Sequence, residues 1–382
     1  MIRIVADDKI PFLEGVLEPY AEVHYLPGSR ITRAELLHAD ALLIRTRTRC
    51  DEELLAGTTV RFIATATIGF DHINTAYCSK AGIRWENAPG CNAGSVQQYM
   101  ASALCTLAHY HGFSLGNKVL GIVGVGNVGR KIEKLAGALG MNVLLNDPPR
   151  ERAEGKGLFV PLDRLLKESD FVSLHVPLYR AGQDKTYHMA DEAFFEKMKK
   201  DAWFFNASRG EVMDSWALAG TLRENRIAGT VLDVWENEPA IDTDLLRMVS
   251  LATPHIAGYS ADGKANGTAM AVNSCSSFFG LGLPHWYPNN IPLPEDPFIQ
   301  LNAAGHSTEE LLAKAILSTY SLESDNGRLR KSPALFESLR GNYPLRREFN
   351  AYTIKMAGEN QVLADGLASL GFHLAKAGID AR

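Results

Sequence analysis

Three residues in the middle of the chain have side chains suited to moving a proton beside a bound anion: Arg209, Glu238 and His255. Histidine exchanges protons near neutral pH, and a neighbouring carboxylate favours its protonated form and orients the ring. Arginine stays charged, and its planar guanidinium binds pairs of oxygens. Together they suit a redox reaction at a 2-hydroxy acid, which needs a base for the hydroxyl proton and a cation for the carboxylate or the developing carbonyl.

Each of these residues follows an apolar run that predicts a β-strand. Ligands of open parallel sheets bind beyond the carboxyl ends of the strands, so this placement favours one shared site. Taken singly, His255 also fits a loop histidine bonded to backbone, Arg209 a surface ion pair, and Glu238 a plain turn. Asp233 ends a very apolar strand, where an unpaired carboxylate is costly to bury, and is therefore not expected to be a mere core residue.

A glycine turn earlier in the chain predicts a dinucleotide site. An apolar strand over 119–123 runs into glycines in G-x-G-x-x-G register, and a helix follows over about 128–139. The glycines allow a tight turn, close approach of a pyrophosphate and close packing of helix on strand, while the helix N-terminus attracts phosphates. The residues of this turn predicted to bind the cofactor are Gly124, Gly126, Asn127, Val128 and Gly129.

Asp147 follows the second strand of this βαβ unit, at about the spacing expected for the carboxylate that binds the adenine ribose hydroxyls. The same carboxylate would repel a 2′-phosphate. NAD is therefore predicted in preference to NADP, although Arg150 and Arg152 stand close by.

The elements that position these residues alternate between apolar strands and helices, which is typical of a parallel α/β sheet. We expect strands over 2–6, 23–25, 41–44, 61–65 and 83–85, and then over 119–123, 142–145, 171–175, 202–205, 231–234 and 249–252. Long helices are expected over 93–111 and 262–279. Beyond a proline-rich boundary we expect helices over 307–320, 334–340 and 360–375 and a strand over 349–355.

The predicted fold class is therefore α/β, with two doubly wound parallel-sheet domains, one Rossmann-type and one flavodoxin-like, and a small α+β C-terminal domain. A chain of 382 residues is long enough for two or three domains. Its net charge of −5 argues against nucleic acid or a membrane surface as the main partner, and no apolar run is long enough to span a membrane.

The five cysteines are odd in number and form no C-x-x-C pair, which is typical of reduced thiols in a cytoplasmic protein. The N-terminus reads as a strand and not as a signal peptide. His109 and His111 have no obvious carboxylate or cysteine partner, so no metal site is predicted.

Three blocks, Asn206–Leu218, Asp233–Pro239 and Thr253–Gly258, resemble the signatures of the D-isomer-specific 2-hydroxyacid dehydrogenases. The resemblance covers roughly residues 40–280. It implies NAD as cofactor, and it implies hydride transfer between substrate C2 and nicotinamide C4, with His255 as acid/base, Glu238 orienting it and Arg209 binding the substrate. It further implies that Asp233 holds the nicotinamide carboxamide, that Val176, Ala207, Ser208 and Gly258 line the cofactor, and that Thr46, Thr67 and Tyr259 touch substrate.

The resemblance also implies how the chain divides into domains. A substrate-binding domain would comprise 1–95 and 257–286, an NAD-binding domain 96–256, and a C-terminal dimerisation domain 287–382, which makes a homodimer. The C-terminal helices would supply a symmetric interface.

Local features within the family, including Thr65–His72 and Ala88–Ala93, imply a small phosphorylated 2-hydroxy acid as substrate. Such a substrate needs cations beyond Arg209. Arg45 and Arg47 follow the strand over 41–44 and would share a face if that strand continued. The alternative is a solvated basic loop.

Two other interpretations of the whole chain stay open. One is a different enzyme of the same chemistry, with a C-terminal regulatory domain that binds an amino acid; the absence of an obvious βαββαβ alternation over 290–382 argues against it. The other is a dinucleotide-sensing corepressor of this fold, which the charge and the absence of a disordered interaction tail disfavour.

Overall fold

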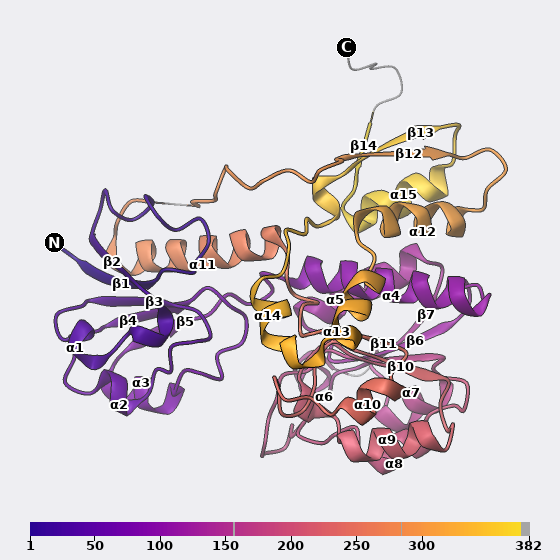
Figure 1. Ribbon diagram of the computed structural model, residues 1–382, viewed down its shortest axis with the longest axis horizontal. Coiled ribbons are helices and arrows are strands. Elements are labelled where there is room, and N and C mark those ends of the chain that lie inside the picture. The colour runs from indigo at the N-terminus through magenta and orange to yellow at the C-terminus, as the bar shows by residue number, and fades with distance from the viewer. Residues whose placement is uncertain (156, 284, 376–382) are drawn as a thin grey trace. The chain divides into compact units, whose positions relative to one another are not determined.

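The computed structural model describes residues 1–155, 157–283 and 285–375. The chain forms two compact units, one of Met1–Asn92 with Ser260–Pro292 and the other of Ala93–Tyr259 with Leu293–Arg382 (Figure 1). Each unit is built on a parallel sheet covered by helices, so the predicted α/β class with two doubly wound sheets is confirmed.

The first unit holds a five-stranded sheet in the order β2-β1-β3-β4-β5. Its strands are β1 Arg3–Asp7, β2 Glu22–Leu26, β3 Ala41–Ile44, β4 Phe62–Thr65 and β5 Arg84–Glu86. This is the flavodoxin-like order. Strand residues point alternately to two apolar clusters: Ile4 and Leu43 join the cluster that contains Val272, and Val5 and Leu42 join the other.

Helix α11 (Ala261–Phe279) covers one face of this sheet, and α1 (Arg33–Leu36), α2 (Glu52–Leu55) and α3 (Thr75–Ala81) lie on the other. Ser260 caps the start of α11 by accepting a hydrogen bond from the Gly263 N–H, and Gly280 ends it with a left-handed φ of 68°. The predicted helix over 262–279 is confirmed.

The second unit holds a six-stranded sheet in the order β11-β10-β9-β8-β6-β7. Its strands are β6 Val119–Val123, β7 Asn142–Asn146, β8 Phe171–Leu174, β9 Trp203–Asn206, β10 Gly229–Leu232 and β11 Leu251–Ala252. The strand order reverses at β6, which makes the carboxyl ends of β6 and β8 the topological switch point where such sheets bind ligands. The strand predicted over 231–234 begins and ends two residues earlier in the structure.

Both faces of this sheet are buried. Phe171 and Phe205 face α4 (Ala93–His111) and α5 (Asn127–Ala138), whereas Val172 and Phe204 face the opposite side. That opposite side is covered by α7 (Leu162–Glu168), α8 (Glu192–Lys197), α9 (Ser215–Arg223) and α10 (Thr243–Met248). Short α6 (Pro148–Glu154) follows β7. The near-continuous apolar strands of the sequence follow from this two-sided burial.

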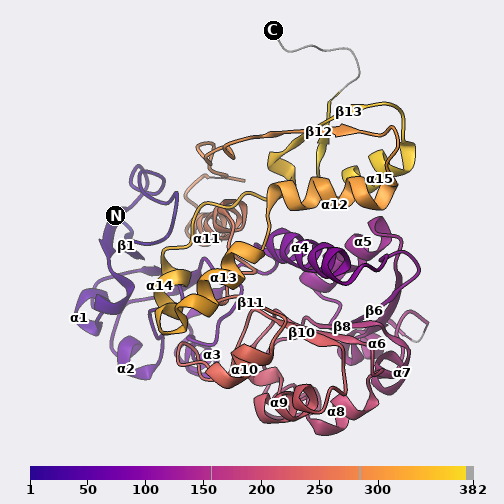
Figure 2. The ribbon, with the colours of Figure 1, turned by 45° about the vertical axis from the view of Figure 1, so that its right-hand side comes forward.

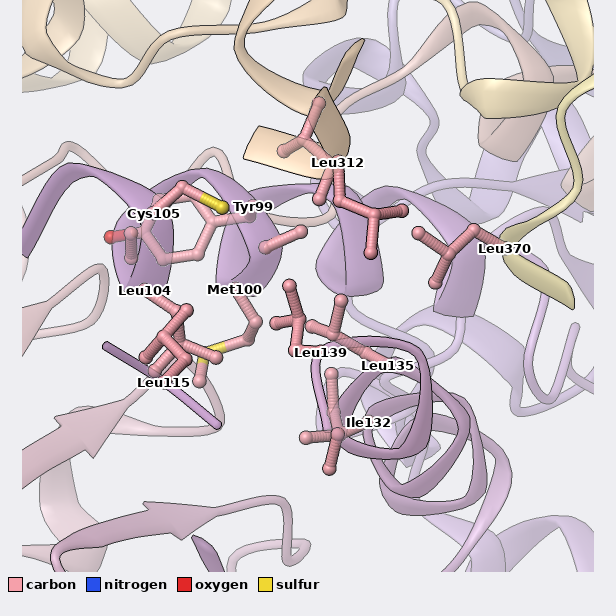
Figure 3. Packing of buried hydrophobic residues seen from close by; sticks show 14 of the residues in the cluster. Tyr99, Met100, Leu104, Cys105, Leu115, Ile132, Leu135, Leu139, Leu312 and Leu370 are labelled. Carbon is pink, nitrogen blue, oxygen red and sulfur yellow. The ribbon is translucent and has the colours of Figure 1, made fainter. Parts of the chain in front are cut away.

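The C-terminal part of the second unit carries a small three-stranded parallel sheet, β12 (Phe298–Asn302), β13 (Thr353–Ala357) and β14 (His373–Leu374). Its helices α12 (Thr308–Thr319) and α15 (Gln361–Leu370) pack on α4 and α5 (Figure 2). Leu312 and Leu370 thereby join the same apolar core as Ile132, Leu135 and Leu139 (Figure 3). The remaining helices are α13 (Glu323–Lys331), against β11, and α14 (Phe336–Gly341).

The C-terminal secondary structure differs from the prediction in two places. The helix expected over 360–375 stops at Leu370, because Gly371 takes a left-handed φ of 106° and the chain then enters β14. The strand expected over 349–355 begins only at Thr353, after one 3-10 turn, and β12 and α13 have no counterpart in the prediction.

None of the helices in residues 1–155, 157–283 and 285–375 combines the length and hydropathy that a membrane span requires.

Candidate active site

The glycine turn after β6 is shaped so that only glycine fits at two of its positions. Gly124 has a φ of 88°, and a Cβ there would lie 2.6 Å from the His175 carbonyl oxygen; a Cβ on Gly129 would lie 2.2 Å from the Gly124 oxygen. A Cβ on Gly126 would meet no protein atom within 4 Å. The turn is therefore tight on its protein side and open at Gly126, as a pyrophosphate site requires.

The other predicted members of this turn lie at the start of α5. Gly126 is the N-cap of the helix, Asn127 is exposed beside it, and Val128 packs partly into the core. Val176 follows β8 and lies next to Gly124, because its Cγ1 would be 2.7 Å from a Cβ on that glycine. The ends of β6 and β8 thus meet at the switch point, and these residues fit a dinucleotide.

Asp147 is fixed next to the glycine turn. One carboxylate oxygen accepts a hydrogen bond from the Val125 N–H at 2.8 Å, and the other caps α6 through the Arg150 N–H at 3.1 Å. Arg150 itself pairs with Glu154, and Arg152 pairs with Asp184. Arg150 and Arg152, the two cations that could have favoured NADP, are thus both paired with carboxylates of the protein.

His255 and Glu238 form a direct pair at the ends of β11 and β10. The distance from His255 Nδ1 to Glu238 Oε2 is 2.7 Å, and Glu238 Oε1 accepts a hydrogen bond from the Trp235 N–H at 2.9 Å. An ionised carboxylate only accepts, so Nδ1 carries a proton and Nε2 is the ring nitrogen left to exchange one with a ligand. The pair has the geometry of an oriented acid/base.

Electrostatics keep Glu238 ionised. Burial alone would raise the pKa of its carboxyl, but the hydrogen bond and charge of His255, the Trp235 N–H and the charge of Arg340 outweigh burial and lower that pKa below its ordinary value. The carboxylate is thus available to stabilise a protonated imidazole.

Asp233 binds the loop that follows His255. Its two carboxylate oxygens accept hydrogen bonds from the Ile256 N–H at 2.7 Å and the Ala257 N–H at 2.9 Å, and from the Thr253 hydroxyl at 2.7 Å. Burial raises the pKa of Asp233. The His255 N–H donates to the Asp233 carbonyl oxygen at 2.7 Å, and His255 has a left-handed φ of 56°. This backbone conformation, rare for histidine, is held by the surrounding hydrogen bonds.

Arg209 lies in the loop after β9. The Asn206 side-chain amide closes this loop: its oxygen accepts hydrogen bonds from the N–H and the hydroxyl of Ser208, and its nitrogen donates to the Arg209 carbonyl oxygen at 2.9 Å. The Arg209 Nη1 donates to the Ser208 carbonyl oxygen at 2.8 Å. A Cβ on Gly210 would lie 2.0 Å from the Trp235 oxygen, so this loop packs on the loop that carries Glu238.

The Trp235 indole N–H in turn donates to the backbone carbonyl oxygen of Thr253 at 3.0 Å, two residues before His255. The structure therefore gathers the loops of Arg209, Glu238 and His255 at one edge of the sheet. The same loops carry Ala207, Ser208, Asp233 and Gly258.

The remaining predicted substrate residues are divided between the units. Tyr259 belongs to the second unit, and Thr46, Thr67, Arg45 and Arg47 belong to the first. The Thr67 hydroxyl forms a hydrogen bond with the Thr65 hydroxyl at 2.7 Å and donates to the Gly69 carbonyl oxygen. The Arg45 Nη1 donates to the Lys9 carbonyl oxygen at 3.0 Å. Strand β3 ends at Ile44, so the continued strand that would put Arg45 and Arg47 on one face does not form.

Two arginines of the C-terminal segment reach this site without any signal in the sequence. The Arg340 Nε donates to the Tyr259 hydroxyl at 3.1 Å, and the buried Arg346 donates through Nη2 to the carbonyl oxygens of Ile256 and Ala257. Neither residue belongs to a motif. Their contacts depend on packing between segments that are far apart in the chain.

Known proteins resemble both the whole chain and its fold. Residues 93–257 match the NAD binding domain of the D-isomer specific 2-hydroxyacid dehydrogenases, and residues 292–371 match a domain of unknown function, DUF3410. An erythronate-4-phosphate dehydrogenase of Bacteroides fragilis is 49% identical over 92% of this chain and 99% of its own length. One of Pseudomonas fluorescens is 40% identical over 96% and 98%.

Among solved structures, the D-lactate dehydrogenase of Aquifex aeolicus, in complex with NAD and lactic acid, is 26% identical with a TM-score of 0.60. The match covers 72% of this chain and 95% of that one. The matched NAD-binding domain contains the glycine turn, Asp147 and the three loop ends, and the matches to the dehydrogenases extend over nearly the whole chain. The chain therefore belongs to the erythronate-4-phosphate dehydrogenases, within the NAD-dependent D-isomer-specific 2-hydroxyacid dehydrogenase family.

Proposed function

We propose that the protein oxidises 4-phospho-D-erythronate at C2 to (R)-3-hydroxy-2-oxo-4-phosphooxybutanoate, with NAD as hydride acceptor, in the biosynthesis of vitamin B6. The observation that carries this proposal is the match to relatives named erythronate-4-phosphate dehydrogenase, which extends over nearly their full length. The paired His255 and Glu238 supply the acid/base that the reaction needs.

The residues would divide the work as follows. His255 Nε2 takes the proton of the C2 hydroxyl while Glu238, bound to Nδ1, stabilises the imidazolium that results. Arg209 binds the substrate carboxylate and the developing carbonyl oxygen. Bound NAD would supply the acceptor for the hydride of C2, at its nicotinamide C4. The C–H and O–H bonds of the alcohol are thereby replaced by C=O, and the proton remains on His255 until water removes it.

The cofactor would lie on the glycine turn. Gly124, Gly126, Asn127, Val128 and Gly129 would hold the pyrophosphate, Asp147 would bind the adenine ribose, and Asp233 would hold the nicotinamide carboxamide. Val176, Ala207, Ser208 and Gly258 line the nicotinamide side. Thr46, Thr67 and Tyr259 contact the substrate, and Arg45 and Arg47 are candidates for its anionic groups.

The C-terminal domain would form a homodimer. Its helices α12 and α15 use their apolar sides on α4 and α5 of the same chain, so we place the interface on the exposed face of the three-stranded sheet. Along β12, Phe298, Gln300 and Asn302 are exposed while Ile299 and Leu301 are buried. Light scattering of the full chain and of the Phe298→Glu variant tests this placement. We expect a dimer for the full chain and a monomer for the variant, and a dimer in both would contradict an interface on this face of the sheet.

Turnover of 4-phospho-D-erythronate, D-3-phosphoglycerate and D-lactate with NAD tests the proposed reaction. An oxo acid is added so that a retained cofactor can be recycled. We expect a preference for 4-phospho-D-erythronate that His255→Ala abolishes and the exposed His109→Ala preserves. Activity on D-3-phosphoglycerate alone would make the protein a 3-phosphoglycerate dehydrogenase. Cofactor binding without turnover of any substrate would favour a dinucleotide sensor.

A further inference from the structure

Arg340 is held beside the acid/base by Tyr259. Its Nε donates to the Tyr259 hydroxyl at 3.1 Å, and its Cζ lies 5.8 Å from the centroid of the same ring. The Tyr259 N–H donates to the Ile256 carbonyl oxygen at 2.8 Å, which makes the ring part of the tight loop that follows His255. The guanidinium of the C-terminal segment is thereby oriented toward the catalytic loop of the NAD-binding domain.

The charge of Arg340 has no counter-charge at contact distance. The charges of Glu238 and Glu337 reach Arg340, but among the ion pairs within 4.0 Å in residues 1–155, 157–283 and 285–375 none involves its guanidinium. Arg328 of the preceding helix, by contrast, pairs with Asp325 at 2.5 Å. Arg340 is only partly exposed, and its field reaches Glu238, whose carboxyl it helps to keep ionised. A partly buried guanidinium whose hydrogen-bond partner is a tyrosine hydroxyl retains donors for an anion.

The proposed substrate carries two anions, a carboxylate next to C2 and a phosphate on C4. Arg209, at the end of β9, is assigned to the carboxylate, so the phosphate needs a cation from another element. A guanidinium suits a phosphate because its fork of N–H groups matches two phosphate oxygens. The Tyr259 hydroxyl engages Nε, so Nη1 and Nη2 are the part of the guanidinium that would bind the phosphate.

We propose that Arg340 binds the phosphate group of the substrate, so that the C-terminal domain supplies a specificity-determining residue of the active site. The proposal rests on the proposed function and deepens it. It makes the preference for a phosphorylated over an unphosphorylated 2-hydroxy acid depend on a residue of the C-terminal segment, which lies outside the matched NAD binding domain.

The test compares 4-phospho-D-erythronate with D-erythronate in the full-length protein. Arg340→Gln should lower kcat/KM for the phosphorylated acid by about 10- to 100-fold, mainly through KM, because a charge-assisted pair is lost. For D-erythronate kcat/KM should fall much less, through the weaker support of Glu238 and Tyr259, so the ratio of the two kcat/KM values should drop. Arg340→Lys should retain part of the preference, since charge is kept and the fork is lost. Lys331→Gln, an exposed cation of the same segment, is the matched control.

An equal fall for both acids would overturn the proposal and make Arg340 a positioning residue for Tyr259. Wild-type kcat/KM values for both acids in Arg340→Gln would show that Arg340 does not bind the phosphate. Protection of the folded protein by inorganic phosphate, measured as a thermal shift, gives a readout without turnover; we expect it in the wild type and not in Arg340→Gln.

Failure of the proposed function would look different. If the wild type turns over 3-phosphoglycerate and not 4-phospho-D-erythronate, the substrate assignment falls, and the ratio of 3-phosphoglycerate to glycerate then tests Arg340. If no acid is turned over, the rise in melting temperature caused by inorganic phosphate is the remaining test. Its loss in Arg340→Gln would support an anion site at Arg340, and the same rise in the variant would overturn the proposal.

Discussion

Arg346 of the C-terminal segment donates a hydrogen bond to the carbonyl oxygen of Ala257 at 2.6 Å, just after His255. Asp233 accepts a hydrogen bond from the N–H of the same Ala257 at 2.9 Å. The loop behind the acid/base is thus held on one side by the sheet and on the other by the C-terminal domain. This arrangement ties the position of His255 to a segment that contributes no strand to the cofactor sheet.

Removing the Arg346 guanidinium should therefore destabilise the loop. Arg346 is buried, and its charge lies 4.3 Å from the centroid of the Tyr320 ring. We expect Arg346→Met to lower the free energy of unfolding by about 3 kcal/mol, because the Ser95 hydroxyl and the carbonyl oxygens of Ile256 and Ala257 lose their donor. Unfolding by heat and denaturant measures this. Arg347→Met, a neighbouring buried arginine, shows whether the effect is particular to the catalytic loop: kcat should fall in Arg346→Met and change less in Arg347→Met.

The Glu238 carboxyl should make stability depend on pH. Its pKa is lowered in the folded protein from an ordinary value of 4.5, so it contributes stability above that pH and loses the contribution as the pH falls through the folded pKa. The melting temperatures of the wild type and Glu238→Gln should differ at pH 7 and converge below about 4.5. A difference that stays constant down to pH 3.5 would contradict the lowered pKa.

Three glycines of one helix region should respond differently to an added methyl group. Gly129→Ala should lower both stability and NAD affinity, since its Cβ would collide with the Gly124 oxygen. Gly126→Ala should keep the melting temperature and weaken NAD binding, because its Cβ would enter the space of the pyrophosphate. Gly137→Ala, in the last turn of α5 with open space around it, should keep NAD binding and raise stability by up to about 0.5 kcal/mol. Calorimetric NAD titration and thermal unfolding of the three variants check this order.

Asp147→Asn should relax the choice of cofactor. The amide can still accept the hydrogen bond from the Val125 N–H, but the negative charge that repels a 2′-phosphate is gone. We expect the ratio of kcat/KM for NAD to that for NADP to fall by about tenfold or more, with most of the change in KM. A ratio equal to that of the wild type would mean that another group selects NAD.

Most of the fold was predictable because its signals are local. Apolar runs predicted the strands of both large sheets, and the helix over 262–279 has its cap and its terminating glycine within the same stretch of sequence. The C-terminal segment was predicted less well. Its last strand contains only His373 and Leu374 and is too short to show a periodicity of its own. Its first, Phe298–Asn302, follows a proline-rich stretch and begins with an exposed phenylalanine, so its residue types do not show the alternation of buried Ile299 and Leu301 with exposed neighbours.

The sequence by itself determined the glycine turn and the polar residues at the strand ends. The reason is physical: a left-handed turn needs glycine at Gly124, and parallel strands bring their carboxyl ends to one edge whatever the rest of the chain does. Only the tertiary structure decided that Arg340 and Arg346 join the loop after His255. Those contacts are made by side chains from a segment that α11, β12, α12 and α13 separate from the loop in the sequence. No local sequence pattern predicts them, because they depend on how α12 and α15 pack on α4 and α5.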